Sequence, residues 1–145
     1  LLCCDANKGD NDALTLDPRN KEMLSGITYL SDGIMEYQDT PPFDCFAIQN
    51  DIDKILRLNG KIDSEHICRQ DTSTQLVKHR KDVFQNTEQI CIDCLTRGIL
   101  TVEWLDSKIQ ECLSRERRED FAGVAIFVYK TYLNRLQERR HLQEG

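Results

Sequence analysis

The sequence lacks any long hydrophobic run and is poor in glycine, proline and histidine. Its longest apolar stretch, Val124 to Tyr129, is far too short to cross a bilayer. Seven glycines in 145 residues leave little material for phosphate-binding loops, and neither a Gly-x-Ser-x-Gly nor a His-Glu-x-x-His motif is present. These absences argue against a membrane-spanning protein and against the common hydrolase and nucleotide-binding classes. We therefore expect neither an enzyme nor a bound cofactor.

The chain also lacks an excess of positive charge. Its formal net charge is -6, with 30% charged and 39% hydrophobic residues. An acidic chain of this kind is not a general nucleic-acid binder. Its apolar content is sufficient for folding, and its length allows one domain with a modest core. We expect a globular protein with no nucleic-acid partner.

Cysteine, in contrast, is abundant and odd in number. Small secreted domains use cysteines as disulfide cross-links, whereas cytosolic proteins of this size rarely keep so many thiols without a metal or a redox task. The chain begins without a signal-peptide pattern, as expected of a secreted chain whose signal peptide has been cleaved. We expect an extracellular protein with at most three intramolecular disulfides. The seven candidates are Cys3, Cys4, Cys45, Cys68, Cys91, Cys94 and Cys112.

The pairing of these cysteines cannot be read from the sequence. The positions of the predicted turns favour bonds between Cys91 and Cys112 and between Cys45 and Cys68, with Cys94 reaching the amino-terminal arm. Which cysteine remains unpaired stays open. Each unstrained bond between helices would stabilise a small bundle by about 2–4 kcal/mol.

The sequence predicts an all-α fold in three parts. Residues 1–16 are polar and acidic, which indicates an extended arm that is anchored only if Cys3 or Cys4 is bonded. Residues 17–140 form the predicted helical domain, a single compact bundle of five or six helices cross-linked by disulfides. Residues 141–145 are expected to fray as a tail. The oligomeric state is not indicated.

The first two helices are predicted from capping residues and periodicity. Asp17-Pro18 is typical of a helix start, and Pro41-Pro42 requires that helix to end before about residue 39. Its expected inner face is Leu24, Ile27, Leu30, Ile34 and Tyr37. Asp44 is expected to cap a second helix, which faces inward with Phe46, Ile48, Ile52, Ile55 and Leu56.

Longer helices are predicted in the second half of the chain. Asp71-Thr72-Ser73 indicates a cap, and the helix that follows ends at Gly98. Thr101 caps the next helix. The final helix is expected to begin near Glu119 and to run through the middle of the fold.

A zinc site is the main alternative to the disulfides. His66-x-Cys68 and Cys91-x-x-Cys94 together offer four ligands of the types that zinc prefers. Such a site would instead indicate an intracellular regulatory or adaptor domain. A redox function of Cys91-x-x-Cys94 is disfavoured, because the motif lies near the carboxyl end of a helix, where the helix dipole disfavours a thiolate.

The charge is unevenly distributed, and this distribution suggests a partner surface. Residues 1–65 carry 6 Lys and Arg against 13 Asp and Glu, whereas residues 97–145 carry 9 against 8. Alternatively, the basic residues near the carboxyl end form a solvated helix face, in which nearby glutamates pair with them. The candidate surface for an acidic partner comprises Arg115, Arg117, Arg118, Lys130, Arg135, Arg139 and Arg140.

Aromatic residues concentrate in the last two predicted helices. Trp104, Phe121, Phe127 and Tyr132 are candidates for an apolar pocket between helices, or they simply form the core. The sequence therefore predicts a secreted, disulfide-stapled helical binding protein of effector, inhibitor or carrier type. It would act by contact with another protein, which we favour, or by holding a small apolar ligand.

Overall fold

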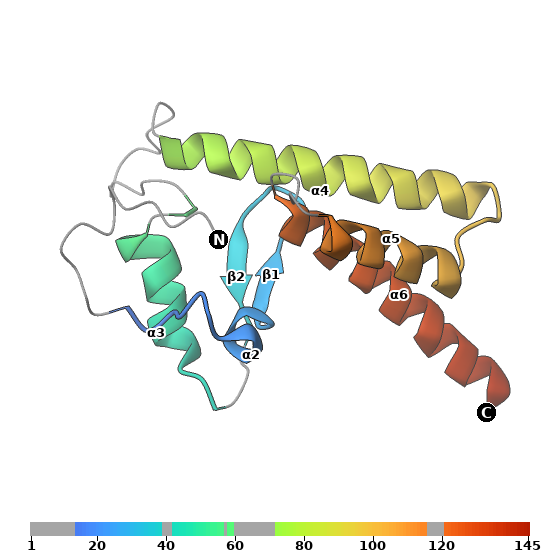
Figure 1. Ribbon diagram of the computed structural model, residues 1–145, viewed down its shortest axis with the longest axis horizontal. Helices are drawn as coiled ribbons and strands as arrows, with labels where there is room; N and C mark the ends of the chain where they lie inside the picture. The colour runs from blue at the N-terminus through green and yellow to red at the C-terminus, as the bar shows by residue number, and fades with distance from the viewer. Residues whose placement is uncertain (1–13, 39–41, 57, 60–71, 116–120) are drawn as a thin grey trace. The chain divides into compact units, whose positions relative to one another are not determined.

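The computed structural model describes residues 14–38, 42–56, 58–59, 72–115 and 121–145. It is mostly helical, as expected, but it also contains a two-stranded sheet (Figure 1). The chain divides into two compact units, Leu1–Lys81 and Asp82–Gly145, where the sequence suggested one bundle. Within the described ranges, no helix is both long and apolar enough to pass through a bilayer.

The first unit replaces the expected helix over residues 17–39 with a short helix and a β-hairpin. Helix α2 covers Lys21–Leu24, and strands β1 (Ile27–Tyr29) and β2 (Met35–Tyr37) pair antiparallel (Figure 1). The prediction of a helix was wrong, because β2 follows a period of two: Met35 and Tyr37 are buried while Glu36 is exposed. Leu30, which was expected on the inner face of the helix, is 40% exposed in the hairpin.

Gly33 makes the hairpin turn possible. It has φ +87°, a left-handed conformation that residues with a Cβ atom rarely adopt. Its N–H donates to the carbonyl of Leu30, and the N–H of Leu30 donates to the carbonyl of Ile34. A Cβ atom at Gly33 would also overlap the backbone carbonyl of Val77. Backbone geometry and close packing both require glycine here.

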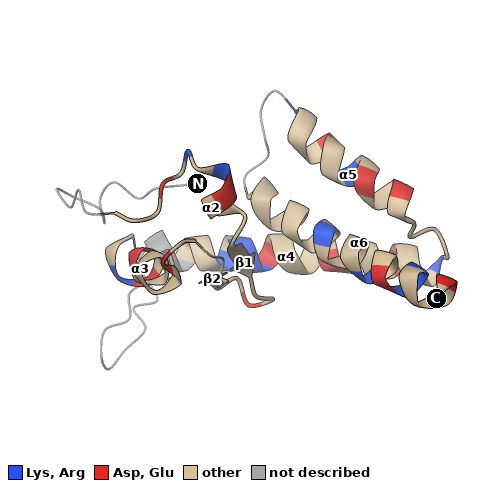
Figure 2. Ribbon diagram, turned by 90° about the horizontal axis from the view of Figure 1, so that it is seen from below, with Lys and Arg blue, Asp and Glu red and all other residues tan. Residues whose placement is uncertain are grey.

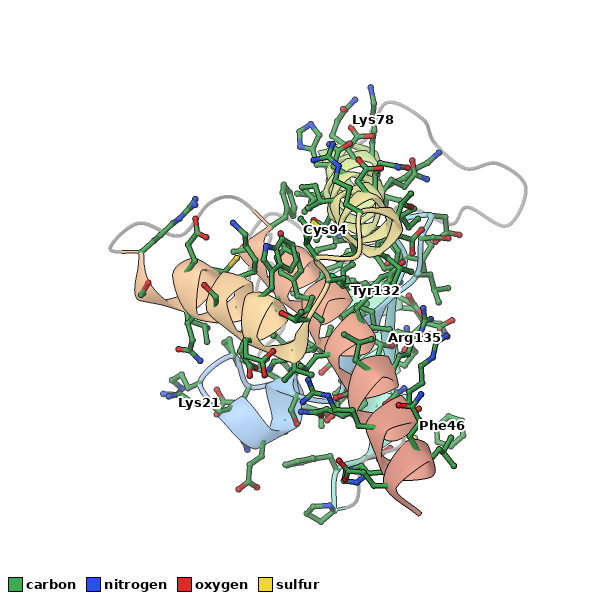
Figure 3. The ribbon with its side chains drawn as sticks, turned by 90° about the vertical axis from the view of Figure 1, so that its right-hand side faces the viewer. Lys21, Phe46, Lys78, Cys94, Tyr132 and Arg135 are labelled. Carbon is green, nitrogen blue, oxygen red and sulfur yellow. The ribbon has the colours of Figure 1, made fainter. Side chains whose placement is uncertain are left out.

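The helix predicted after Asp44 is present, in two parts. Helix α3 (Cys45–Asn50) is capped by the Asp44 side chain, as predicted, and continues as the π-helix η1 (Asp51–Ile55). Ile48, Ile52 and Leu56 are buried. Phe46 was expected to face inward, but it is 86% exposed, because a helical residue two positions before Ile48 lies on the opposite face (Figure 3).

The end of the expected amino-terminal arm is part of the core. Residues 1–13 lie outside the described ranges, but Leu16 is only 3% exposed. The backbone N–H groups of Thr15 and Leu16 donate to Oδ2 of the buried Asp51, at 2.6 and 2.7 Å. The anchor at residues 14–16 is therefore a carboxylate on η1, which the sequence did not indicate.

Arg80 connects several segments of the first unit. The residue is 4% exposed, and burial lowers the pKa of its guanidinium below the usual range. The guanidinium donates to the backbone carbonyls of Gly33, at 2.7 Å, and of Leu58, and it approaches Oδ1 of Asn59 at 3.4 Å. One side chain thus satisfies two backbone acceptors that burial would otherwise leave without partners.

The second unit consists of three long helical segments. Helix α4 (Thr72–Thr96) crosses the unit boundary, and α5 (Val102–Ser114) packs against α6 (Ala122–Glu144). Both predicted signals between α4 and α5 are confirmed: Gly98 has φ +73°, and Thr101 accepts a hydrogen bond from the Trp104 N–H. The tail expected to fray from residue 141 is helical as far as Glu144.

The fold predicts different penalties for alanine at two left-handed glycines. We expect Gly33→Ala to destabilise the protein by about 3–5 kcal/mol, since it adds overlap with the Val77 carbonyl to backbone strain. Gly98→Ala is the control, because a Cβ atom at this position would have no neighbour within 4 Å in the described part of the chain; we expect a loss of about 1–2 kcal/mol. Urea unfolding followed by circular dichroism measures both. Equal losses would contradict the close packing at Gly33.

Candidate functional site

A cleft lies among the three helices of the second unit. Its volume is about 280 Å³. Two small residues of α6, Ala122 and Ala125, form part of its wall, where larger side chains would fill the space. The lining residues are Val83, Asn86, Thr87, Ile90, Lys108, Glu111, Cys112, Arg115, Phe121, Ala122, Ala125 and Tyr129.

Tyr129 is the buried residue of this lining that combines an aromatic ring with a hydroxyl. It is 7% exposed, and its ring packs edge-on against Trp104 with centroids 6.0 Å apart. Within the described part of the chain, the Tyr129 hydroxyl makes no hydrogen bond. Burial, followed by the nearby thiols and Glu111, raises the pKa of Tyr129 to about 12. At neutral pH the hydroxyl is therefore a neutral hydrogen-bond donor.

The rim of the cleft carries three charged residues of α5 and its carboxyl end. Lys108 Nζ and a guanidinium nitrogen of Arg115 both contact the Glu111 carboxylate, at 3.2 and 2.9 Å. These bonds lower the pKa of Glu111, chiefly through Arg115. Lys108 also lies 5.7 Å from the centre of the Trp104 ring. Helix α5 carries more acidic than basic residues, and Figure 2 shows its basic residue between acidic ones.

Three of the cysteines lie in the second unit. Cys91 is completely buried, and burial, with contributions from Cys94 and Glu88, raises the pKa of its thiol to about 11. Cys94 packs beside this core (Figure 3), and Cys112 lines the cleft. No disulfide joins the four described cysteines, which include Cys45 in the first unit, so the expected pairing of Cys91 with Cys112 stays a prediction.

The remaining cysteines and half of the zinc set lie outside the described residues. Cys3, Cys4, His66 and Cys68 all fall in this category. Among the residues that the structure describes, no group of three or more histidine, cysteine and acidic side chains could hold a metal ion. The zinc alternative of His66, Cys68, Cys91 and Cys94 therefore stays a hypothesis.

Of the four aromatic residues predicted to form a pocket, Phe121 lines the cleft. Trp104 packs against Tyr129, and Phe127 faces Phe84, with ring centroids 6.5 Å apart. Tyr132 is covered by Arg135 at 5.4 Å (Figure 3). Tyr129 was not predicted as a site residue, although it ends the apolar run of α6, where a buried hydroxyl needs a partner.

The predicted basic surface is divided. Lys130, Arg135, Arg139 and Arg140 are exposed along α6 (Figure 2), and Arg140 lies 3.9 Å from Glu103. Arg115 belongs instead to the rim of the cleft. Arg117 and Arg118 lie outside the described residues.

Comparison with known proteins gives no match: no family model, curated protein or solved structure is significantly similar to this chain.

In the reduced protein, the buried thiol of Cys91 predicts a loss of stability at alkaline pH. Its folded pKa of about 11 exceeds the ordinary value of 9.0, so folding favours the protonated form. The stabilisation is fully present below pH 9 and is lost as the pH rises toward 11. We expect the melting temperature to fall over this range, and to fall less steeply in Cys91→Ala. An identical pH dependence in the variant would contradict this assignment.

Proposed function

We propose that the protein is a small, non-enzymatic binding protein that takes an apolar ligand into the cleft of its second unit. The observation that carries the proposal is Tyr129, a buried residue that lines the cleft and whose hydroxyl has no hydrogen-bond partner among the described residues. Buried polar groups nearly always have a partner, and a ligand would supply the one that this hydroxyl lacks.

The walls and size of the cleft support a small apolar ligand. Val83, Ile90, Phe121 and two alanines contribute apolar surface to the lining. Ligand pockets typically hold about 300–1,000 Å³, so this cleft, at about 280 Å³, lies just below that range. A molecule of one or two rings fits this volume better than a long chain.

Secretion and disulfide formation are part of the same proposal. Seven cysteines in 145 residues support an extracellular protein in which disulfides stabilise the helices. The buried and partly buried positions of Cys91, Cys94 and Cys112 in one core are compatible with such a role.

Contact with another protein is the second candidate. It is favoured by the exposed carboxyl-terminal half of α6, where basic residues surround Leu142, which is 82% exposed. An acidic partner with an apolar contact would complement this helix end. The cleft is the stronger candidate, because exposed charge on a helix is equally well explained by solvation.

The oxidation state of the cysteines tests the proposed compartment. If three disulfides form, reduction of the native protein increases its intact mass by about six hydrogens. A thiol titration of the unfolded but unreduced protein should then find a single thiol. Seven thiols together with one zinc ion per chain would overturn the extracellular proposal and support the intracellular zinc domain.

Filling the cleft tests the proposed binding site. We expect the neutral fluorophore N-phenyl-1-naphthylamine to bind the wild-type chain and to quench Trp104 emission. Ala122→Leu, which adds a larger side chain to the cleft wall, should weaken this binding at least about tenfold. Asn134→Leu is the matched control, since it places the same side chain at an exposed position of α6 outside the cleft. Equal affinities in both variants would exclude binding in the cleft.

A further inference from the structure

The chemistry of the ligand can be inferred from the groups around Tyr129. The residue is 93% buried, since its exposed fraction is 7%, and its hydroxyl makes no hydrogen bond within the described part of the chain. A phenolic hydroxyl both donates and accepts. Which of these the ligand uses depends on the charges that face the hydroxyl.

The groups that influence Tyr129 come from both neighbouring helices. Cys91 and Cys94 belong to α4, and Cys112 and Glu111 belong to α5; all four raise the pKa of Tyr129. No cation of the described residues contributes to this shift. At neutral pH the Cys91 thiol is protonated and uncharged, so the negative charge that matters here is the Glu111 carboxylate, which lines the cleft together with Tyr129. A negatively charged ligand oxygen beside the Tyr129 hydroxyl would be repelled by this carboxylate.

The cations at the rim do not change this conclusion. Lys108 and Arg115 both bind the carboxylate of Glu111, so part of their charge is already compensated. A carboxylate ligand that reached Tyr129 would lie close to Glu111 and would lose its own hydration. A neutral oxygen incurs neither penalty.

We propose that the cleft binds an apolar molecule that carries one neutral oxygen acceptor, such as a ketone, ester or ether oxygen, and that this oxygen accepts a hydrogen bond from the Tyr129 hydroxyl. The inference rests on the proposed function, because it specifies the ligand of the same cleft. It also gives Tyr129 a role in binding that differs from a role in folding. A buried hydroxyl without a partner among the described residues does not stabilise the unliganded protein.

Three probes that share a naphthalene body test the inference: 2-acetylnaphthalene, 2-ethylnaphthalene and 2-naphthoate. Binding to the full chain is measured by titration calorimetry. We expect the ketone to bind about fivefold more tightly than the hydrocarbon, in line with one net hydrogen bond, and the carboxylate to bind most weakly. In Tyr129→Phe, the ketone should lose this advantage while the affinity of the hydrocarbon stays unchanged.

Thermal unfolding separates a binding role from a structural one. We expect unliganded Tyr129→Phe to melt at the same temperature as the wild type or at a higher one, because it removes a buried polar group without a partner. Tyr29→Phe is the control, since Tyr29 belongs to the first unit and does not line the cleft. It should leave the preference for the ketone intact.

Each other outcome overturns a defined part of the proposal. If none of the three probes binds the wild-type chain, the proposed function itself fails. If the probes bind without preference for the ketone, if that preference survives in Tyr129→Phe, or if the carboxylate binds most tightly, the cleft remains a binding site but the inferred chemistry is wrong. A lower melting temperature of Tyr129→Phe would likewise overturn the inference, since it would assign a structural partner to the hydroxyl.

Discussion

The arrangement of the first unit depends on buried side chains that hydrogen-bond to the backbone, and the Arg80 guanidinium connects the most distant segments in this way. It binds the carbonyl of Gly33 at the hairpin turn and the carbonyl of Leu58 after η1. Asn59 then pairs with the backbone N–H and carbonyl of Met35 on β2. The hairpin, the end of η1 and α4 are thus connected by side chains that replace the water lost on burial. Hydrophobic contacts alone would not specify this arrangement.

In the second unit, one buried polar group has no hydrogen-bond partner among the described residues. Tyr129 is buried beside an open cleft, and its hydroxyl lacks a partner among the described residues. Unsatisfied groups of this kind cost stability, and each one in a native protein calls for an explanation, such as a ligand that completes the network. The contrast between Arg80, which binds two backbone carbonyls, and Tyr129, whose hydroxyl has no partner in the described part of the chain, is the reason to look for function in the second unit.

Local signals in the sequence predicted the elements that depend on neighbouring residues. Asp44 and Thr101 cap helices as expected, and Gly98 ends α4 in the left-handed conformation. The hairpin was missed because Ile27, Leu30, Ile34 and Tyr37 are spaced as on one helical face, whereas β2 buries Met35 and Tyr37 with a period of two. The choice between these periods depends on Gly33 packing against the backbone of α4, which lies more than forty residues later in the chain. Of the four candidate pocket residues, Phe121 alone lines the cleft, because pocket walls come from three separate segments.

The sequence by itself determined that the chain is mostly helical, where α4 ends and α5 begins, and that the chain carries an unusual number of cysteines. These properties follow from capping, helix propensity and composition, which act over a few residues. The tertiary structure alone decided that Asp51 and Arg80 are buried and that Tyr129 lines a cleft without a partner among the described residues. The surroundings of a side chain depend on contacts between segments that are distant in sequence, and a helical period cannot distinguish a buried hydroxyl with a partner from one without.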